Sequence, residues 1–388
     1  MILTSHGNSP FRETSDLTMF DCVAHCPIGL EDVTAAELAG LGLEVVSAKP
    51  NEGRVEWRGT LADVAAANLV SRTAERVTLA LDRFRAMHFP ELRRKAAQIE
   101  WERWIGPDDR VALRVTSKRS KLYHERAIAE RIAGAISDRL GREVGVASGD
   151  ALDDPDAGVQ LVLVRVFKDE ATLRLDTSGP RLHRRGYRQA TAKAPLRETL
   201  AAALLAASGW RPGNALVDPF CGSGTIPIEA ASWAAGIAPG TARTFRFEHW
   251  PQRVERPELE SPGEPPSAPI IGSDRDAGAI EASRSNRERA GVDVDFVQRS
   301  VSEVEAPADA STGWIVTNPP YALRTDAGGD VRDLYGAFGQ VLRERFAGWN
   351  CTMLCADDAF AQATAVDWDA GPLVSNGGVR VRVLHRVL

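Results

Sequence analysis

The sequence lacks the marks of a membrane-bound or secreted protein. No apolar run in its 388 residues approaches the roughly 20 residues that a membrane-spanning helix needs. The polar start, MILTSHGNSPFRETSDLT, has neither the basic region nor the apolar stretch of a signal peptide. We therefore expect a cytoplasmic protein without a membrane partner, whose residues 1–19 form a disordered leader.

Cysteine is scarce and is not spaced as in a metal site. The five cysteines include two pairs, Cys22 with Cys26 and Cys351 with Cys355, each within an apolar run typical of a strand. Zinc sites use closer spacings in loops, with further ligands nearby. Positions four apart on a strand face the same way, so we interpret these residues as buried thiols and predict no metal.

Basic residues are not in excess either. The formal net charge of -6 argues against attachment to nucleic acid or membranes by bulk charge. Two local basic clusters nevertheless stand out, and each can either hold a phosphate backbone or form a solvated charged face. The first surrounds Tyr187 in a stretch without acidic residues and contains Arg181, His183, Arg184, Arg185, Arg188 and Lys193. The second, in SKRSKLYHER, contains Lys118, Arg119 and Lys121.

Strand and helix patterns divide the rest of the chain into three predicted domains. Residues 20–75 alternate short strands and helices, as in a small α+β unit. Residues 76–180 close with two alternating strands joined at Lys168 and Asp169. Residues 181–388 alternate apolar strands with alanine-rich helices, which indicates an α/β domain with a doubly wound parallel sheet.

Three further stretches add detail to this division. GPLVSNGGVRVRVLHRVL predicts two strands around a turn at Asn376, so an antiparallel hairpin should close the last sheet. PQRVERPELESPGEPPSAP predicts an exposed insertion. Trp101 and Trp104 suggest base stacking at first sight, but their spacing of three favours anchoring in a core.

A glycine turn follows the first strand of the last domain. LVDPFCGSGTIPIEAA places Asp218 at the end of the strand, Gly222 and Gly224 in the turn, and a helix after Thr225. Such a turn lets a ligand approach the backbone and directs free helix N–H groups at it. The stretch lacks the Gly-Lys-Ser/Thr of a P-loop and the Gly-x-Gly-x-x-Gly of a dinucleotide site, which argues against both.

An acidic residue ends the next parallel strand. In IIGSDRDAG, Asp274 stands where a carboxylate can accept hydrogen bonds from a ribose diol. It lies further from the glycines than is usual, because the proline-rich insertion comes between them. The alternative is that Asp218 and Asp274 are ordinary strand-end and helix-capping residues.

The stretch TNPPY ends another apolar strand. Pro319 and Pro320 cannot donate ladder hydrogen bonds, so the strand must stop there. Beyond it, Asn318 offers an amide oxygen, Pro319 a carbonyl of fixed direction, and Tyr321 an aromatic plane. These groups can accept both N–H bonds of an exocyclic amine and stack on its ring; the alternative is an ordinary strand-to-loop stop.

DPFCGSGT combined with TNPPY resembles the class I amino-methyltransferases that use S-adenosylmethionine. LHRRGYRQATAKAPLRETLAAALL, IAPGTARTF and the front stretches GLEDVTAAEL, NLVSRTAERV and IEWERWIGPDD narrow the resemblance to the THUMP-domain RNA guanine-N2 methyltransferases of the RlmL type, from about residue 20 onward. The resemblance implies a ferredoxin-like domain over 20–75, a THUMP RNA-binding domain over 76–180 and a Rossmann-like methyltransferase domain over 181–388. It also implies S-adenosylmethionine as cofactor and RNA, either 23S rRNA or tRNA, as partner.

The resemblance assigns roles to residues of this chain. It implies that Asn318, Pro319, Pro320 and Tyr321 hold the target base. It implies cofactor contacts from Pro195, Leu196, Asp218, Pro219, Cys221, Gly222, Gly224, Thr225, Asp274, Arg275 and Ser300. It favours RNA contact by Lys118, Arg119 and Lys121, and by Arg184, Arg185, Arg188 and Lys193.

The chain departs from the family pattern at three places. Many RlmL-type chains carry a second methyltransferase half, whereas this sequence stops after the first. Ser300 stands where an acid is expected to hold the adenine amine, so that contact can move to Glu303 or to the backbone. Ala322 follows Tyr321 where glycine is frequent.

Two alternative functions stay open at this point. An adenine-N6 methyltransferase acting on RNA or DNA would use the same residues Asn318, Pro319, Pro320 and Tyr321, which we call the clamp, because they fit any exocyclic amine. An RNA-binding or assembly factor would keep the cofactor pocket without turnover. The identity of the methylated nucleoside separates the first alternative from guanine-N2 methylation, and cofactor binding without methyl transfer would indicate the second.

Overall fold

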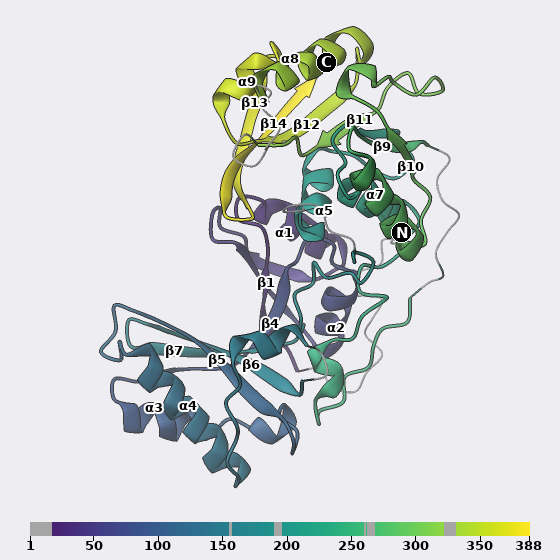
Figure 1. Cartoon of the computed structure of the whole chain (residues 1–388). Helices are drawn as coiled ribbons and strands as arrows, with labels where there is room; N and C mark the ends of the chain where they lie inside the picture. Colours follow the sequence, from purple (N-terminus) through teal and green to yellow (C-terminus); the bar gives the residue numbers. More distant parts are fainter. Residues whose placement is uncertain (1–17, 155–156, 190–195, 260, 262–267, 322–330) are drawn as a thin grey trace.

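The computed structural model describes residues 18–154, 157–189, 196–259, 261, 268–321 and 331–388. Figure 1 shows one sheet running from the centre of the molecule to its lower left and a second sheet at the top. The predictions for most of the leader, for Lys193, for Pro195 and for Ala322 lie outside the described residues. Within those residues, no helix is long and apolar enough to cross a membrane.

The first sheet has seven strands in the order β2-β3-β1-β4-β7-β6-β5, and only the β5–β6 pair is parallel. This part of the chain contains β1 (Phe20–His25), α1 (Glu31–Gly40), β2 (Glu44–Ser47), β3 (Arg54–Gly59), α2 (Leu61–Val70), β4 (Arg76–Arg85), α3 (Phe89–Ala96), β5 (Arg110–Lys118), α4 (Glu125–Leu140), β6 (Val159–Phe167) and β7 (Glu170–Asp176). The turn between β6 and β7 has positive φ angles at Lys168 and Asp169, as the sequence predicts for a tight hairpin.

Strand β4 is shared by the two predicted front domains. Residues 76–79 pair with β1, whereas residues 78–85 pair with β7. A bulge between Ala80 and Asp82 lets the strand bend between its two partners. The predicted boundary between residues 75 and 76 therefore falls at the start of a strand that runs through one continuous sheet.

Helices α1 to α4 cover one face of this sheet (Figure 1). Ala24 of β1, Leu79 of β4 and Val164 of β6 belong to the core beneath these helices. Because side chains alternate along a strand, the intervening positions, such as Val23 and Arg165, point to the opposite face. That opposite face is left uncovered by the four helices.

A segment that follows the glycine turn returns to the first core. Phe245, Phe247 and Trp250 are buried there. Trp250 packs edge-on against Trp104, with 4.9 Å between ring centroids. Trp101 and Trp104 are 0% and 3% exposed, which confirms the prediction that both anchor the core.

The second sheet has the order β10-β9-β8-β11-β12-β14-β13, in which β14 alone is antiparallel to β12 and β13. Its part of the chain contains α5 (Glu198–Ala207), β8 (Leu216–Asp218), α6 (Thr225–Ala234), β9 (Ile270–Asp274), α7 (Ala277–Ala290), β10 (Asp295–Gln298), β11 (Trp314–Thr317), α8 (Val331–Arg345), β12 (Asn350–Cys355), α9 (Asp358–Ala363), β13 (Asp369–Asn376) and β14 (Val379–Val387).

Helices cover both faces of the second sheet. Val316 and Leu354 share a core with α5, α6 and α7, whereas Val217 and Ile315 share another with α8. The predicted doubly wound α/β domain is therefore confirmed, and so is the hairpin at its edge. The strand order reverses between β8 and β11, the position at which open α/β sheets bind ligands.

The paired cysteines are all buried. Cys22, Cys26, Cys351 and Cys355 are free thiols with exposures of 5% or less. This confirms the prediction of buried thiols. In the described part of the chain, no group of three or more His, Cys, Asp or Glu side chains is arranged to hold a metal ion.

Candidate active site

The site lies where β8 and β11 end side by side at the point of strand-order reversal. β8 ends at Asp218 and leads into the glycine turn, and β11 ends at Thr317 and leads into Asn318. The Thr317 hydroxyl donates a hydrogen bond to Asp218 Oδ1 at 2.6 Å, so the two strand ends are joined by their side chains. No local pattern in the sequence predicts this contact.

Asp218 is enclosed by the protein. Its exposure is 1%, and its Oδ1 also accepts from the Phe220 N–H at 3.1 Å. Burial raises the pKa of Asp218 to about 7, while the Thr317 and Phe220 hydrogen bonds oppose the rise. Oδ1 of Asp218 thus contacts the end of β11, the clamp strand, and the contact of Asp218 with the cofactor stays a prediction.

The backbone of the glycine turn is held from both sides. The Cys221 N–H donates to the Ser273 carbonyl at 2.9 Å, and the Gly224 N–H donates to the Cys221 carbonyl at 2.8 Å. The Gly222 N–H donates to Asp274 Oδ2 at 3.1 Å. The acid predicted to bind ribose therefore also fixes the turn that starts α6.

The two glycines of the turn serve different purposes. Gly224 has a φ of +85°, and a Cβ there would lie 2.6 Å from Phe296 Cζ and 3.0 Å from Ser283 Cβ. Gly222 has a φ of +52°, and no atom lies within 4 Å of the position its Cβ would take. Gly222 is therefore the glycine beside which a ligand has room to approach. Gly224 is required because Phe296 packs against it.

Asp274 is held in one orientation beside this open space. Its Oδ1 accepts from the Asp276 N–H at 2.9 Å, while Oδ2 accepts from Gly222. Burial raises the pKa of Asp274, and these two backbone hydrogen bonds oppose the rise. Each carboxylate oxygen has a further lone pair, so the group can still accept from a diol.

The clamp residues follow β11 as the sequence predicts. Asn318 is half-buried, Pro319 is buried, and the strand ends at Thr317, before the two prolines. The Tyr321 hydroxyl donates to Asn318 Oδ1. Tyr321 thus contacts the amide oxygen that was predicted to receive an amine, and its stacking on a base stays a prediction. Burial raises the pKa of Tyr321, and a hydrogen bond with the side chain of Asn376 opposes the rise.

The remaining predicted cofactor residues surround these turns. Ser300 is exposed, and its N–H donates to Glu303 Oε2 at 2.9 Å. Arg275 is exposed beside Asp274, whereas Cys221, Thr225 and Leu196 are buried to at least nine-tenths. Burial raises the pKa of the Cys221 thiol, so no reactive thiolate is expected there.

The prediction that Arg185 and Arg188 of the first basic cluster contact RNA is wrong. Arg185 is 5% exposed, donates to the Leu182 carbonyl at 2.7 Å and lies 3.5 Å from Glu229. Arg188 lies 2.8 Å from Glu198 and donates to the Leu196 carbonyl. These acids neutralise the two guanidinium groups inside the protein, so neither is available to a phosphate.

The same buried contacts join the front of the chain to the second sheet. Arg185 donates to the Arg72 carbonyl, and Arg72 itself donates to the Ile237 carbonyl at 2.7 Å. The Tyr187 hydroxyl donates to Glu229 Oε1 at 3.0 Å. Of the predicted RNA contacts in this cluster that the structure describes, Arg184 is the exposed one.

The second basic cluster lies at the surface. Lys118, Arg119 and Lys121 are exposed at the end of β5. Next to them, Tyr123 is 67% exposed and packs on His124, with 4.1 Å between ring centroids. An exposed aromatic pair among cations suits base stacking, and the adjacent Tyr123 and His124 in the sequence are the signal for it.

Three family models match the chain. They are an RMKL-like methyltransferase domain over residues 185–370, an RlmL ferredoxin-like domain over 21–78 and a THUMP domain over 86–176. The chain is 36% identical, over 94% of its length, to the "Ribosomal RNA large subunit methyltransferase K/L" of Methylococcus capsulatus, of which it covers 50%. It spans about half the length of the first curated relatives. It is also 33% identical to a "Putative RNA methyltransferase" of Synechocystis sp., with 92% of this chain and 94% of that protein covered.

Solved structures are similar over nearly the whole chain. One, named as "a putative methyltransferase complexed with SAH", has a TM-score of 0.80 and 27% identity, with 96% of this chain and 99% of the other covered. Another, named as "a predicted N6-adenine-specific DNA methylase" of Listeria monocytogenes, has a TM-score of 0.77 and 30% identity, with 94% and 96% covered.

Proposed function

The chain belongs to the family of THUMP-domain RNA methyltransferases of the RlmL type, and we propose that it methylates the exocyclic N2 of a guanosine in structured RNA, with S-adenosylmethionine as cofactor. One observation carries the proposal. The glycine turn, Asp274 and the Asn-Pro-Pro-Tyr clamp meet where the strand order reverses, and the Thr317–Asp218 hydrogen bond fixes the clamp strand against the turn.

The residues at the turn fit an adenosine-containing cofactor. Gly222 leaves room beside its Cα, and the N–H groups that start α6 follow it. Asp274 would accept from the ribose hydroxyls next to that space. The tendency of burial to favour the protonated form of Asp274 is opposed by its two backbone partners. Direct contact of Arg275 and Ser300 with the cofactor stays part of the proposal.

The clamp can activate a nucleobase amine, which is a poor nucleophile. Its lone pair is delocalised into the ring, so the nitrogen must be made tetrahedral before it can react. When bound, S-adenosylmethionine supplies an electrophilic methyl group on a sulfonium centre. Asn318 Oδ1 and the Pro319 carbonyl accept the two N–H bonds and turn the lone pair toward that methyl group.

These hydrogen bonds strengthen as positive charge develops on nitrogen, so they act on the transition state rather than on binding alone. The amide oxygen of Asn318 has two lone pairs, and it can accept from both the amine and the Tyr321 hydroxyl. The nitrogen held by Asn318 and Pro319 would accept the methyl group of the bound cofactor, and it would then lose its extra proton to water. No strong general base is required.

RNA is the proposed substrate because a THUMP domain precedes the catalytic domain. The names of the curated relatives point to large-subunit ribosomal RNA, and we propose 23S rRNA ahead of tRNA on that basis. The target base must leave its stack to reach the clamp, so a flipped or single-stranded guanosine is expected. We also propose a cytoplasmic location, on the basis of the RNA substrate alone.

Adenine N6 is a second candidate target. The clamp accepts any exocyclic amine, and the Listeria relative is named for that reaction on DNA. The product separates the two candidates. The protein is incubated with methyl-labelled S-adenosylmethionine and unmodified RNA, the RNA is separated into ribosomal and transfer fractions, and the labelled nucleoside is identified. Label in N2-methylguanosine supports the proposal, and label in N6-methyladenosine or no label despite cofactor binding contradicts it.

A further inference from the structure

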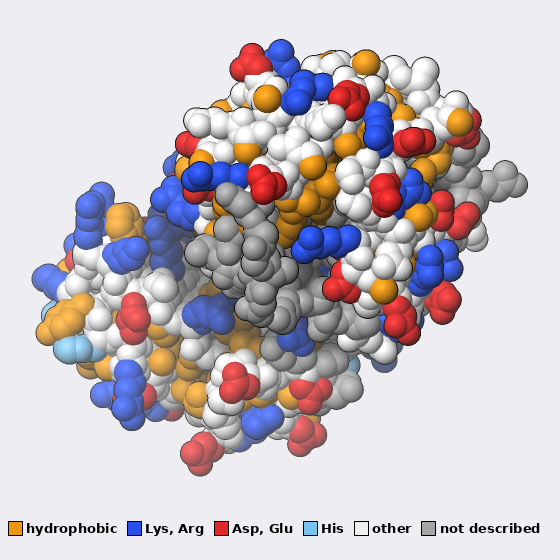
Figure 2. Space-filling model, turned by 45° about the horizontal axis from the view of Figure 1, so that its top comes forward, with side chains coloured by type: hydrophobic (Ala, Val, Ile, Leu, Met, Phe, Trp, Pro, Cys, Tyr) orange, Lys and Arg blue, Asp and Glu red, His pale blue; other side chains and the backbone are white. Residues whose placement is uncertain are grey.

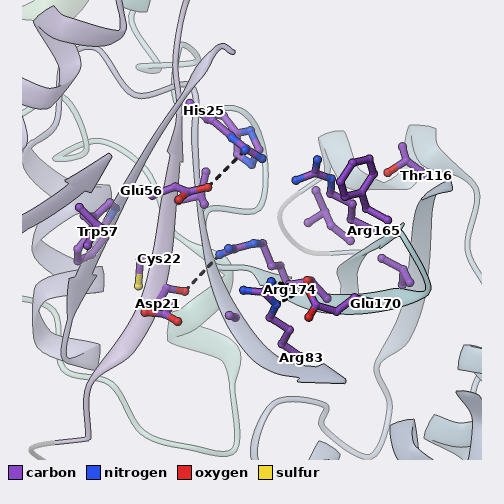
Figure 3. Close-up of a pocket in the computed structure, with 18 of the residues that line it drawn as sticks. Asp21, Cys22, His25, Glu56, Trp57, Arg83, Thr116, Arg165, Glu170 and Arg174 are labelled. Carbon is purple, nitrogen blue, oxygen red and sulfur yellow. Dashed lines mark hydrogen bonds and ion pairs between the residues drawn. The ribbon is translucent and has the colours of Figure 1, made fainter. Parts of the chain in front are cut away.

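The face of the first sheet opposite helices α1 to α4 contains a hollow lined by arginines. It has a volume of about 550 Å³. Figure 3 shows Arg165 and Arg174 extending from their strands toward the strands that carry Asp21 and Glu56. Six arginines line it against three carboxylates, and the set comprises Arg54, Arg58, Arg83, Arg114, Arg165 and Arg174 with Asp21, Glu56 and Glu170. We call it the arginine pocket.

Strand register places these cations in rows across the sheet. Arg114 of β5 pairs with Leu163 of β6, which pairs with Arg174 of β7. Two residues further along, the next row contains Arg165 of β6, whose β7 partner Thr172 pairs with Arg83 of β4. Rows on one face of a sheet are about 6.5 Å apart, because alternate residues share a face. The rows therefore offer several cationic positions to one extended polyanion.

The carboxylates of the arginine pocket neutralise only part of its charge. Asp21 lies 2.9 Å from Arg58, Glu56 lies 3.4 Å from Arg54, and Glu170 pairs with Arg83. Among the residues that the structure describes, no carboxylate forms an ion pair with the other three arginines, Arg114, Arg165 and Arg174.

Arg174 is the most enclosed of these three arginines. It is partly buried, and its guanidinium donates a hydrogen bond to the Asp21 backbone carbonyl at 3.2 Å. Burial lowers the pKa of Arg174, and the nearby Glu56 and Asp21 carboxylates oppose only part of the fall. Burial, together with Arg76, Arg174 and other arginines, also lowers the pKa of His25 on the pocket wall to about 4.

We propose that the arginine pocket binds the phosphate backbone of a single-stranded segment of the RNA substrate. Guanidinium groups hold phosphates through paired hydrogen bonds. A cavity of about 550 Å³ is in the range that encloses a drug-sized molecule, so it admits a few nucleotides of one strand and no duplex. Phe167, which lies 5.3 Å beneath the Arg165 guanidinium, offers a ring beside the path.

Basic side chains next to the arginine pocket continue the proposed RNA-binding surface. Figure 2 shows Lys and Arg side chains gathered on the left-hand lobe and in the hollow next to it. Phe167 of the pocket pairs across the sheet with Lys118, at the start of the exposed basic loop that leads to Tyr123. The pocket belongs to a different sheet from the clamp, so it contacts a part of the RNA away from the methylated base. This inference rests on the proposed function for the identity of the strand.

The test compares binding of labelled oligouridylate by the full chain and two double variants. Arg114→Ala with Arg165→Ala removes two exposed, carboxylate-free arginines of the pocket. Arg94→Ala with Arg131→Ala removes two exposed arginines from α3 and α4, on the opposite face of the sheet. Fluorescence anisotropy over a salt series gives both the affinity and its salt dependence.

The pocket variant should bind at least about tenfold more weakly, as expected for loss of charge-assisted hydrogen bonds. Its log–log salt slope should fall by about 1.4, at about 0.7 for each phosphate contact of a single strand. The α3–α4 variant should match wild type in both quantities. An unchanged affinity and slope in the pocket variant would overturn the inference, as would equally tight binding of duplex RNA or polyglutamate by wild type.

Methyl transfer is measured on the same preparations, so that the proposed function and the pocket assignment are tested separately. If wild type methylates RNA and the pocket variant binds oligouridylate like wild type, the pocket assignment fails while the proposed function stands. If wild type transfers no methyl group but the pocket variant loses strand binding, the proposed function fails while the pocket assignment stands. If both proposals hold, the pocket variant should show a raised KM with kcat close to wild type.

Discussion

Thr317 and Asp218 are separated by 99 residues in the chain, yet the threonine hydroxyl lies 2.6 Å from the aspartate Oδ1. Both side chains are buried, at 0% and 1% exposure. Asn318 is the next residue after Thr317, and the glycine turn follows Asp218. The hydrogen bond therefore sets the position of the amine acceptor relative to the cofactor turn.

Thr317→Val tests this positioning role. The substitution keeps the shape of the side chain but removes its donor, so Asn318 loses its link to the turn. We expect kcat to fall by at least about tenfold with little change in cofactor affinity, because small displacements of a reacting group are costly. Thr317→Ser retains the hydroxyl and should restore activity. A Val variant as active as wild type would show that the hydrogen bond has no part in the reaction.

Asn318→Ala should remove one of the two proposed acceptors for the amine. Turnover should fall by at least about a hundredfold, the scale for one preorganised polar contact, while cofactor affinity measured by calorimetry stays near that of wild type. Tyr321→Phe is the matched control, since it deletes the hydroxyl that reaches Asn318 but keeps the ring. Its kcat should exceed that of Asn318→Ala. Equal activity of Asn318→Ala and wild type would exclude the clamp.

Asp218→Asn should change stability in a pH-dependent way. Burial raises the pKa of Asp218 to about 7 from an ordinary value of 3.8, so the folded state binds this proton more tightly than the unfolded state. The associated stability is present at low pH and is lost as pH rises from about 4 through 7. The asparagine variant resembles the protonated carboxyl and keeps Oδ1. In urea denaturation its advantage over wild type should grow from pH 5 to pH 8; a difference that stays constant over this range would contradict the shift.

Gly222→Ala and Gly224→Ala should have different consequences. At Gly224 the new methyl group would clash with Phe296 at a positive φ, and we expect a loss of about 2 kcal/mol in unfolding free energy. At Gly222 the methyl group meets no protein atom, so the loss should be about 1 kcal/mol, from φ alone. Cofactor affinity should fall more for Gly222→Ala. The reverse order of affinities would place the ligand elsewhere.

Local rules predicted much of the architecture. β11 ends at Thr317 because two prolines follow it, and the β6–β7 hairpin turns at Lys168 and Asp169 as expected. The doubly wound sheet was visible because its buried strands are continuous apolar runs. These features depend on neighbours in the chain, and they need no knowledge of distant partners.

The errors concern partners that are distant in sequence. Arg185 and Arg188 occur in a basic run that is typical of an exposed surface, but Glu229 and Glu198 reach them from α6 and α5. Likewise, nothing near Asp218 in the sequence indicates Thr317. The sharing of β4 between two predicted domains depends on a bulge, which the sequence pattern does not mark.

The central claim, that the acceptor is the exocyclic amine of a guanosine, has a direct test. Substrate RNA is transcribed with inosine in place of guanosine, which removes only the 2-amino group, and its labelling by methyl-labelled S-adenosylmethionine is compared with that of the guanosine RNA. Binding of both transcripts is measured alongside, so that a loss of folding or affinity is recognised. The account predicts labelling of the guanosine transcript and none of an inosine transcript that still binds. Equal labelling of both would contradict it and direct attention to adenine N6.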